Sequence, residues 1–276
     1  MEAGETDWNR VWAEMIRENH SVPGFRTGRD LWGKRRVAAE YRVPAERVAA
    51  TLALLPLASG ISVLDIGAGP GTLALPIAGR VKSVTAVEPA AGMVSVIEEK
   101  TGASGQKNIR VVQKRWEAVV PARDLEGPYD LVIASFSLAM EDLAAALKKM
   151  DAVSSESVHL FWFADLPGWE RHYLEIWPSL HGAPYCPVPK ADVVFNLLWQ
   201  MGLHPNLSMM PLFEEEHFRD LEEALVHYAP KFGVTDAGQE KVVREALGWW
   251  LVAEGDGLVM RERSRAAHIW WEKEED

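Results

Sequence analysis

The feature that most limits how this chain can fold is a short apolar run that enters a glycine-rich turn. Residues 61–66 are typical of a buried strand, and the turn Gly67-Ala68-Gly69-Pro70-Gly71 follows directly. Glycine adopts backbone conformations closed to other residues, so such a turn lets backbone N–H groups approach a ligand closely. A helix predicted over 72–78 would add unpaired N–H donors and the positive end of its dipole. The sequence therefore predicts a strand, a ligand-binding turn and a helix, in that order.

Short apolar runs then alternate with amphipathic segments. The predicted strands are 83–87, 109–112, 129–134 and 157–163, and the predicted helices between them are 91–100 and 138–150. Strands that alternate with helices form a parallel sheet with helices on both faces. Ligands of such sheets bind at the carboxyl ends of the strands. We therefore predict an α/β fold with its site at that edge.

The flanking segments have a different character. Residues 5–50 predict helices, broken at Pro23–Gly24 and at Pro44, and carry an apolar stripe at helical spacing made of Trp8, Trp12, Met15 and Ile16. Residues 165–212 contain seven prolines, many aromatic residues and no sustained period, which predicts an irregular insertion with one short helix over 192–201. Helices over 218–228 and 236–253 and a last strand over 266–271 follow.

These patterns predict four parts of the chain. Residues 1–50 would form an N-terminal helical cover, 51–164 a ligand-binding core, 165–212 an inserted cap, and 213–276 the helices and last strands that complete the core.

Composition limits the classes of partner. The chain of 276 residues has a formal net charge of −11, whereas a protein that grips phosphate backbones needs a basic surface. A local basic patch at Lys34, Arg35 and Arg36 does not change that balance, so we expect no nucleic-acid partner. No apolar run reaches the roughly 18–20 residues that span a bilayer, and the polar, acidic N-terminus is unlike a secretory signal.

The number and spacing of the cysteine and histidine residues argue against a disulfide and against a metal site. The single cysteine, Cys186, excludes an internal disulfide and a cysteine-based zinc cluster. The histidines are scattered, with no His, Asp or Glu pair at ligand spacing near the fourth strand, so we expect no metal site. We expect a cytoplasmic protein with no membrane partner.

Two positions indicate which ligand the glycine turn holds. Asp65 lies two residues before the first glycine, where dinucleotide-binding folds carry an apolar residue. An anion there repels a pyrophosphate but suits a ligand with an ammonium or sulfonium charge. The dinucleotide fingerprint G-x-G-x-x-G also requires glycine at position 72, where this chain has Thr72. Both observations argue against NAD or FAD.

The predicted second strand ends in Val87-Glu88-Pro89. An acidic residue at this place can accept hydrogen bonds from both hydroxyls of a ribose. In isolation Glu88 would be an ordinary solvated loop residue. Combined with the preceding turn, it favours a ligand that carries a ribose.

Three successive segments resemble the motifs of class I S-adenosylmethionine-dependent methyltransferases. They are D-I-G-A-G-P-G-T-L from Asp65, V-T-A-V-E-P-A-A-G-M from Val84 and Y-D-L-V-I-A-S-F-S-L from Tyr129. The resemblance covers about residues 60–165, with the motifs in the family's order and spacing. It implies a Rossmann-like, seven-stranded sheet, six strands parallel and one antiparallel, with residues 266–271 in one of the last two strands.

The resemblance also implies where S-adenosylmethionine and its product S-adenosylhomocysteine bind. The turn would lie against the methionine portion, with Asp65 near the amino group, Glu88 on the ribose and Met93 near the adenine. The cofactor-binding residues expected from these motifs are Asp65, Gly67, Ala68, Gly69, Gly71, Thr72, Glu88, Pro89 and Met93.

Two further stretches are assigned in the same way. In this family the loop after the third strand holds an acidic residue that bonds the adenine amino group, and here it reads Lys114-Arg115-Trp116-Glu117. Trp116 would stack beside the adenine and Glu117 would contact its amino group, or both would only support a local helix. Ser135 and Phe136, after the fourth strand, would face the sulfonium and the transferred methyl.

The sequence argues against several classes of methyl acceptor. The stretch Ser135-Phe136-Ser137-Leu138 differs from the Asn/Asp-Pro-Pro-Tyr/Phe motif of adenine and glutamine-amide N-methyltransferases, and no cysteine stands at the motif position of C5-pyrimidine enzymes. Methyl transfer from a sulfonium is an in-line displacement that depends mainly on positioning. A general base is needed only when the acceptor must lose a proton.

The insertion would cap the crevice and supply that base. Its candidate lining residues are Trp169, His172, Tyr173, Trp177, His181 and Tyr185, with His172 and His181 as candidate bases. His20 and Trp32 would join as part of a lid, so residues 1–50 and 165–212 would form a mobile cover. Ordinary packing is the alternative for each of these side chains.

We therefore expect an S-adenosylmethionine-dependent methyltransferase that acts on a small molecule. An RNA or protein methyltransferase and a non-catalytic protein that binds the cofactor are the alternatives. The sequence leaves open the oligomeric state and whether N, O, S or C is methylated.

Overall fold

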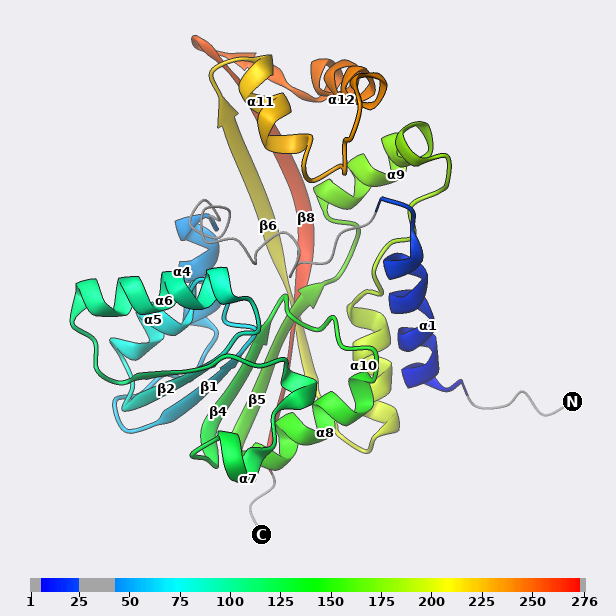
Figure 1. Cartoon of the computed structure of the whole chain (residues 1–276). Helices are drawn as coiled ribbons and strands as arrows, with labels where there is room; N and C mark the ends of the chain where they lie inside the picture. The colour runs from blue at the N-terminus through cyan, green and yellow to red at the C-terminus, as the bar shows by residue number, and fades with distance from the viewer. Residues whose placement is uncertain (1–5, 25–42, 274–276) are drawn as a thin grey trace, which may run out of the picture.

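The fold is built on a single β-sheet, and the helices pack around it (Figure 1). The computed structural model describes residues 6–24 and 43–273. Its strands are β1 (Ser62–Ile66), β2 (Ser83–Val87), β3 (Ile109–Val112), β4 (Tyr129–Ser135), β5 (Ser154–Phe163), β6 (Asn206–Phe218), β7 (Val252–Glu254) and β8 (Gly257–Glu272). Their order is β3-β2-β1-β4-β5-β8-β6, and β7 pairs with the first residues of β8.

The strand directions agree with the expected fold class. Strands β1 to β5 pair in parallel, whereas β8 is antiparallel to both β5 and β6. In the seven-strand order, β8 alone is therefore reversed. The Rossmann-like arrangement of six parallel strands and one antiparallel strand is confirmed, residues 266–271 lie within β8, and β7 is a short addition.

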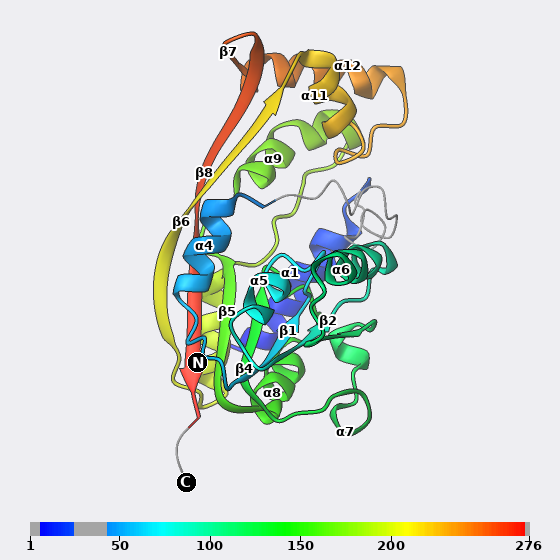
Figure 2. The same ribbon diagram turned by 90° about the vertical axis from the view of Figure 1, so that its left-hand side faces the viewer.

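Helices cover both faces of the sheet (Figure 2). One face carries α4 (Ala45–Ala53), α5 (Ala74–Ala78) and α6 (Ala91–Ser104), and the other carries α8 (Leu143–Val153) and α10 (Ala191–Gln200). A short helix η1 (Trp116–Ala118) and α7 (Pro121–Asp124) connect β3 to β4. Within the described ranges, no helix has the length and apolar character needed to cross a bilayer.

The central strands are apolar almost throughout because both of their faces are covered. On β1, Val63 packs into the core under α4 and α5, and Leu64 packs into the core under α8 and α10. Both side chains are fully buried. This two-sided burial explains why Val63 and Leu64 are apolar neighbours, where a strand with one exposed face would alternate apolar and polar residues.

The predicted N-terminal stripe forms α1 (Trp8–Ser21), which packs against α8 and α10. Trp12 is fully buried and its indole N–H donates to the carbonyl of Met140 at 2.8 Å. The side chain of Asn9 accepts from the N–H of Ala144 and donates to Asp142. We call the two apolar layers that flank the sheet, taken together, the main core; α1 is thus part of it. Trp32 and the basic patch at Lys34, Arg35 and Arg36 lie outside the described residues.

Strands β6 and β8 extend beyond the other strands as a two-stranded ribbon (Figure 1). Around its far end lie α9 (Gly168–His181), α11 (Leu221–Tyr228) and α12 (Ala237–Trp250). Their apolar side chains form a second hydrophobic core with Phe218 of β6 and Met260 of β8. We call this part, the three helices with the ribbon end, the upper core.

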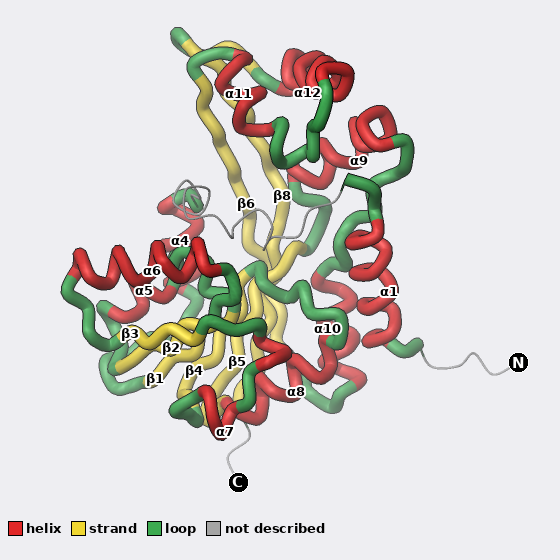
Figure 3. Tube along the Cα trace, in the orientation of Figure 1, coloured by secondary structure: helices red, strands yellow, loops and turns green. Residues whose placement is uncertain are grey.

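Within 165–212 the short helix predicted over 192–201 is confirmed as α10, whereas the irregular structure predicted around it was wrong. The segment contains the 14-residue helix α9, the helix α10 and the start of β6, as the trace in Figure 3 shows. Five of its seven prolines lie at the ends of helices and strands or in the loops between them. Their frequency in the sequence suggested an irregular segment, although regular elements lie between them. The sequence of β6 does not alternate between apolar and polar residues, because outward-facing residues such as Met209 and Phe213 are apolar although they are exposed. The helix predicted over 218–228 begins only at Leu221, because Phe218 ends β6.

Pro211 lies in the middle of β6, which is the edge strand. Its partner in register is Arg265, whose N–H donates to Asp165 and whose carbonyl accepts from Ala164, both on the β5 side. The backbone of Pro211 therefore faces the open edge, where its missing N–H breaks no ladder bond. Proline at such a position also discourages another strand from adding to the edge.

Candidate functional site

The turn between β1 and α5 has the backbone that its glycines predict. Gly67, Gly69 and Gly71 have φ angles of 74°, 55° and 80°, in the left-handed region that favours glycine. The N–H groups of Gly67 and Ala68 donate to the carbonyl of Val87, at 2.8 and 3.2 Å. These bonds hold the turn against the carboxyl end of β2. Helix α5 begins at Ala74 and has only five residues, so the helix predicted from Thr72 starts later and is too short to contribute a dipole.

The space beside the three glycines differs. A Cβ atom on Gly67 would lie 2.3 Å from the Cβ of Ser137, and one on Gly71 would lie 2.9 Å from Leu75. A Cβ atom on Gly69 would meet no other atom within 4 Å. The fold itself requires Gly67 and Gly71. At Gly69 the backbone faces open space, where a ligand can approach it.

Glu88 connects the turn to α6. Its Oε2 accepts from the N–H of Gly69 at 2.9 Å, and its Oε1 accepts from the N–H of Ala90 at 2.8 Å. Burial raises the pKa of Glu88, and the two N–H donors oppose that rise. A carboxylate offers about four lone-pair positions, so this side chain can still accept bonds from ribose hydroxyls.

Asp65 is the last but one residue of β1, which ends at Ile66, and is 2 % exposed. One carboxyl oxygen accepts from the N–H of Ala74, whereas Oδ2 has no hydrogen-bond partner. Burial, and then the charge of Glu88, raise the pKa of Asp65 to about 7. A buried polar atom without a partner is rare in proteins and calls for an explanation, such as a ligand.

These residues fit the chemistry of S-adenosylmethionine. The orphaned oxygen of Asp65 matches an ammonium group, the open side of Gly69 admits a ligand against the backbone, and Glu88 supplies acceptors for a ribose. Asp65 and Glu88 lie at the carboxyl ends of the neighbouring strands β1 and β2, and Gly69 lies in the turn after β1.

The residues predicted for the adenine side have mixed surroundings. Met93 is buried in the first turn of α6, and Pro89 is half-buried. Trp116 is 2 % exposed and its indole N–H donates to the carbonyl of Ala146 in α8, at 3.1 Å. Those are contacts of a core side chain, which favours the packing alternative for Trp116. Glu117 is exposed, and its contact with the adenine amino group stays a prediction.

The residues after β4 form the edge where the methyl group is expected. Among the described residues, Phe136 is the one non-glycine residue with a positive φ, 54°, a conformation that costs on the order of 1–3 kcal/mol and is concentrated at functional sites. Its N–H donates to the carbonyl of Phe161. Its ring lies 4.1 Å from the guanidinium carbon of Arg47 and 4.9 Å from the ring of Phe163. Ser135 is half-buried beside it.

Charged side chains on the inner face of the ribbon were not predicted. Glu214 of β6 and Glu262 of β8 are directly opposite in register, and like charges in that position destabilise a sheet. Each has a basic partner: Arg47 is 3.2 Å from Glu214, and His172 Nε2 is 3.0 Å from Glu262. Burial raises the pKa of Glu214, and Arg47 opposes this.

One feature of the sequence could have indicated this polar layer. It is the run Glu214-Glu215-Glu216 within an apolar stretch. On a strand, residues 214 and 216 share a face with Met210, Leu212 and Phe218. Met210 and Leu212 belong to the main core and Phe218 to the upper core. A polar layer therefore separates the two cores on this face of the ribbon.

The candidate bases have different surroundings. His172 pairs with Glu262 in that polar layer, and its ring stacks on Trp250 at 3.9 Å. His181 bonds the carbonyl of Phe232 through Nε2, at 2.8 Å, within the upper core. His20 lies at the end of α1. Partial burial of its ring lowers its pKa, Glu141 opposes this change and Arg115 adds to it.

The remaining aromatic residues predicted for the cap belong to the upper core. They are Trp169, Tyr173, Trp177 and Tyr185. The ring of Trp169 lies 6.0 Å from that of Phe163, which in turn contacts Phe136. A continuous series of rings thus connects the edge at Phe136 with the upper core.

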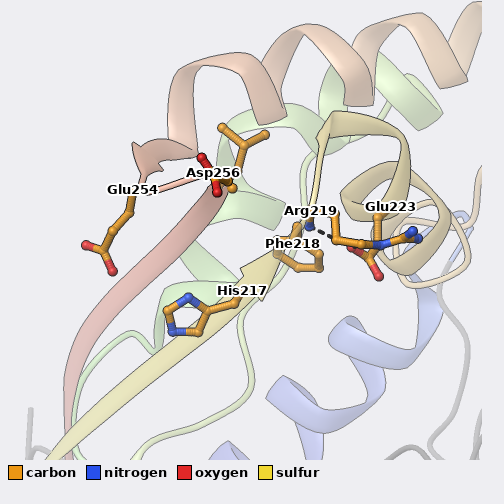
Figure 4. A pocket seen from close by; sticks show the side chains of 8 residues that line it. His217, Phe218, Arg219, Glu223, Glu254 and Asp256 are labelled. Carbon is orange, nitrogen blue, oxygen red and sulfur yellow. Dashed lines mark hydrogen bonds and ion pairs between the residues drawn. The ribbon is translucent and has the colours of Figure 1, made fainter.

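A separate pocket lies at the far end of the ribbon (Figure 4). Its lining includes His217, Arg219, Glu223 and Glu254, and none of the residues of the glycine turn. Glu215, His217 and Glu254 come close enough together to share a metal ion. Arg261, however, already bridges the two glutamates, so its guanidinium neutralises them.

Comparison with known proteins gives a family match for the segment that builds the turn. Residues 63–157 match a family described as a methyltransferase domain. An uncharacterized protein of Haemophilus influenzae is 28% identical over 166 residues, 58% of this chain and 59% of that protein. Ribosomal RNA small subunit methyltransferase G of Alteromonas mediterranea is 28% identical over 120 residues, 41% of this chain and 55% of that protein.

The fold also has relatives among solved structures. A candidate methyltransferase from Bacillus halodurans is 14% identical and superposes with a TM-score of 0.59 over 84% of this chain and 100% of that one. At this identity the likeness concerns the fold. The chain spans less than two thirds of the length of the two curated relatives above.

Proposed function

We propose that this chain, whose residues 63–157 match a methyltransferase domain, is a class I S-adenosylmethionine-dependent methyltransferase that transfers the methyl group of S-adenosylmethionine to a small-molecule acceptor. The observation that supports this best is the orphaned carboxyl oxygen of Asp65 beside the open face of Gly69. Among the ligands of Rossmann-like folds, one that carries an α-ammonium group suits that pair.

The residues of the turn would bind and orient the cofactor. Asp65 would take the ammonium group, the backbone at Gly69 would lie against the methionine portion, and Glu88 would accept bonds from the ribose. Bound S-adenosylmethionine supplies an electrophilic methyl group on a sulfonium, and the sulfur leaves as neutral thioether. Because this step needs no bond to the protein, the contribution of the chain is positioning and exclusion of water.

The acceptor would bind between Phe136 and the polar layer of the ribbon. Phe136 lies at the strand edge next to the glycine turn, and Arg47 connects it to Glu214. His172, held by Glu262, is the candidate base for an acceptor that must lose a proton. His181 is the weaker candidate, since its ring nitrogen is engaged with the backbone of Phe232.

Binding measurements test the proposal without knowledge of the acceptor. Calorimetric titration with S-adenosylmethionine and S-adenosylhomocysteine should give micromolar affinities, and NAD and FAD should not bind. A ligand at 100 times its dissociation constant adds about 2.7 kcal/mol of stability, so thermal unfolding provides a second readout. Stabilisation by a dinucleotide alone would refute the proposal.

An RNA acceptor is the second candidate, favoured by the similarity to a ribosomal RNA methyltransferase over 41% of the chain. The net charge of −11 argues for the small molecule. Transfer of labelled methyl groups from S-adenosylmethionine separates the two: label should pass to a small-molecule extract, and passage to ribosomal RNA from ribosomal subunits would favour the alternative.

A further inference from the structure

Two carboxyl groups lie close together in the glycine-turn site, and their hydrogen bonding differs. Glu88 accepts two backbone N–H bonds, at 2.9 and 2.8 Å. Asp65 accepts one, from Ala74, and its Oδ2 accepts none. Asp65 is also the more buried of the two, at 2 % exposed against 7 %. Of the pair, Glu88 is the better stabilised anion and Asp65 is the better site for a proton.

The charged groups around Asp65 do not offset its burial. From β2, Glu88 adds a like charge. From α6, Lys100 donates to the carbonyl of Pro70 at 3.3 Å, and no Lys or Arg of residues 6–24 and 43–273 is among the groups that shift the pKa of Asp65. From the loop after β4, Ser137 donates to the carbonyl of Ile66. Burial and a neighbouring carboxylate both favour the neutral acid, and they raise the pKa of Asp65 to about 7.

We infer that Asp65 is a neutral acid in the free protein and ionises when the α-ammonium group of the cofactor binds beside it, so that binding releases a proton. The O–H bond of the acid breaks, its electron pair stays on the carboxylate, and the proton passes to solvent. The ligand keeps its ammonium protons and forms an ion pair. This inference rests on the proposed function, because it assumes that the cofactor binds at the glycine turn.

The sign of the pH dependence follows from the linkage between ligand and proton. The ligand binds the ionised form of Asp65, so affinity falls as pH decreases through the pKa of the free protein. With a pKa of about 7, about 0.9 proton should be released per ligand at pH 6 and about 0.1 at pH 8, and the dissociation constant should be about tenfold larger at pH 6.

Calorimetry with S-adenosylhomocysteine tests this directly. The observed enthalpy is measured at pH 6 and pH 8 in two buffers with different ionisation enthalpies, and the difference between buffers gives the number of protons released. The matched ligand is 5′-methylthioadenosine, which has the nucleoside and thioether but no ammonium or carboxylate group. It should bind with no proton release and with the same affinity at both pH values.

The matched variant is Asp65→Asn, which keeps an acceptor for the N–H of Ala74 but cannot ionise. It should bind S-adenosylhomocysteine more weakly than the wild type at pH 8, with no proton release. If the variant fails to fold, the comparison of the two ligands on the wild-type protein decides alone.

The outcomes separate this inference from the proposed function. Binding of S-adenosylhomocysteine without proton release would overturn the inference and leave the methyltransferase proposal intact. Equal proton release with 5′-methylthioadenosine would assign the proton to another group and also overturn it. Absence of binding by both ligands would overturn both proposals.

Discussion

A buried pair of histidines inside the sheet should make the protein sensitive to acid. Nδ1 of His159 on β5 and Nε2 of His268 on β8 are 2.9 Å apart, and Nδ1 of His268 has no partner. The rings are 5 % and 2 % exposed and stack with Phe161 and Trp270. Burial lowers the pKa of each from 6.5 to about 4, and the charge of His268 adds to this for His159.

The sign and size follow from linkage. In the unfolded chain both imidazoles take up protons below pH 6.5, whereas in the folded protein they stay neutral to about pH 4. Stability is therefore fully present above pH 6.5 and is lost as pH falls towards 4. At about 1.4 kcal/mol per pH unit, one imidazole removes about 2 kcal/mol between pH 7 and pH 5, and the pair removes up to about 4 kcal/mol.

The double variant His159→Phe/His268→Phe isolates this effect. Replacing both partners by apolar rings of similar shape removes the titration without leaving a new unpaired polar group. Urea unfolding at pH 7 and pH 5 should show a smaller loss of stability in the variant than in the wild type. His204→Phe, at an exposed position, should behave like the wild type. Equal losses in wild type and double variant would refute the reasoning.

Three further predictions concern the site. Glu88→Ala removes the carboxylate proposed to accept hydrogen bonds from the ribose, and a bond to a charged group contributes roughly 1.5–3 kcal/mol. S-adenosylhomocysteine should therefore bind at least tenfold more weakly by calorimetry; normal binding would show that Glu88 is not at the ribose. Gly69→Val should fold, because the space beside Gly69 is open, with a loss of stability of about 1–2 kcal/mol for a side chain on a left-handed backbone, but it should no longer bind the cofactor. Gly67→Ala should lose more stability than Gly69→Val, because its Cβ would meet Ser137. The reverse order of stability in thermal unfolding would contradict the geometry. Hydrogen exchange with S-adenosylhomocysteine should slow at residues 67–71 and also in the N-terminal and inserted segments, and a response confined to the turn would mean that those segments are static packing.

The ligand-binding half of the fold was predictable because its information is local. Strands β1 to β5 are short apolar runs in regular alternation with helices, and the turn at Gly67–Gly71 carries its own conformational signature. The two acidic positions at strand ends, Asp65 and Glu88, needed only the spacing along the chain. Each of these signals is contained within a few consecutive residues.

The second half needed information that no local window contains. Arg47, Glu214 and Glu262 come from α4, β6 and β8, and only the pairing of distant strands brings them together. Helix α9 was missed because Pro178 lies within it. For Trp116, the family pattern indicated a ligand contact, but the hydrogen bond to Ala146 of α8 depends on a packing partner thirty residues away.

The ribbon of β6 and β8 belongs to both hydrophobic cores, and this has a consequence for folding. Its lower residues, such as Met210, are buried with the main sheet, and its upper residues, such as Phe218, are buried with α9, α11 and α12. No loop separates the two halves, so the upper core cannot lose its packing without fraying a ladder that continues into the sheet. The parts of the chain would therefore unfold in one cooperative transition rather than two. A chimera that takes its upper core from a related protein would therefore need the ribbon end from that protein as well as the three helices.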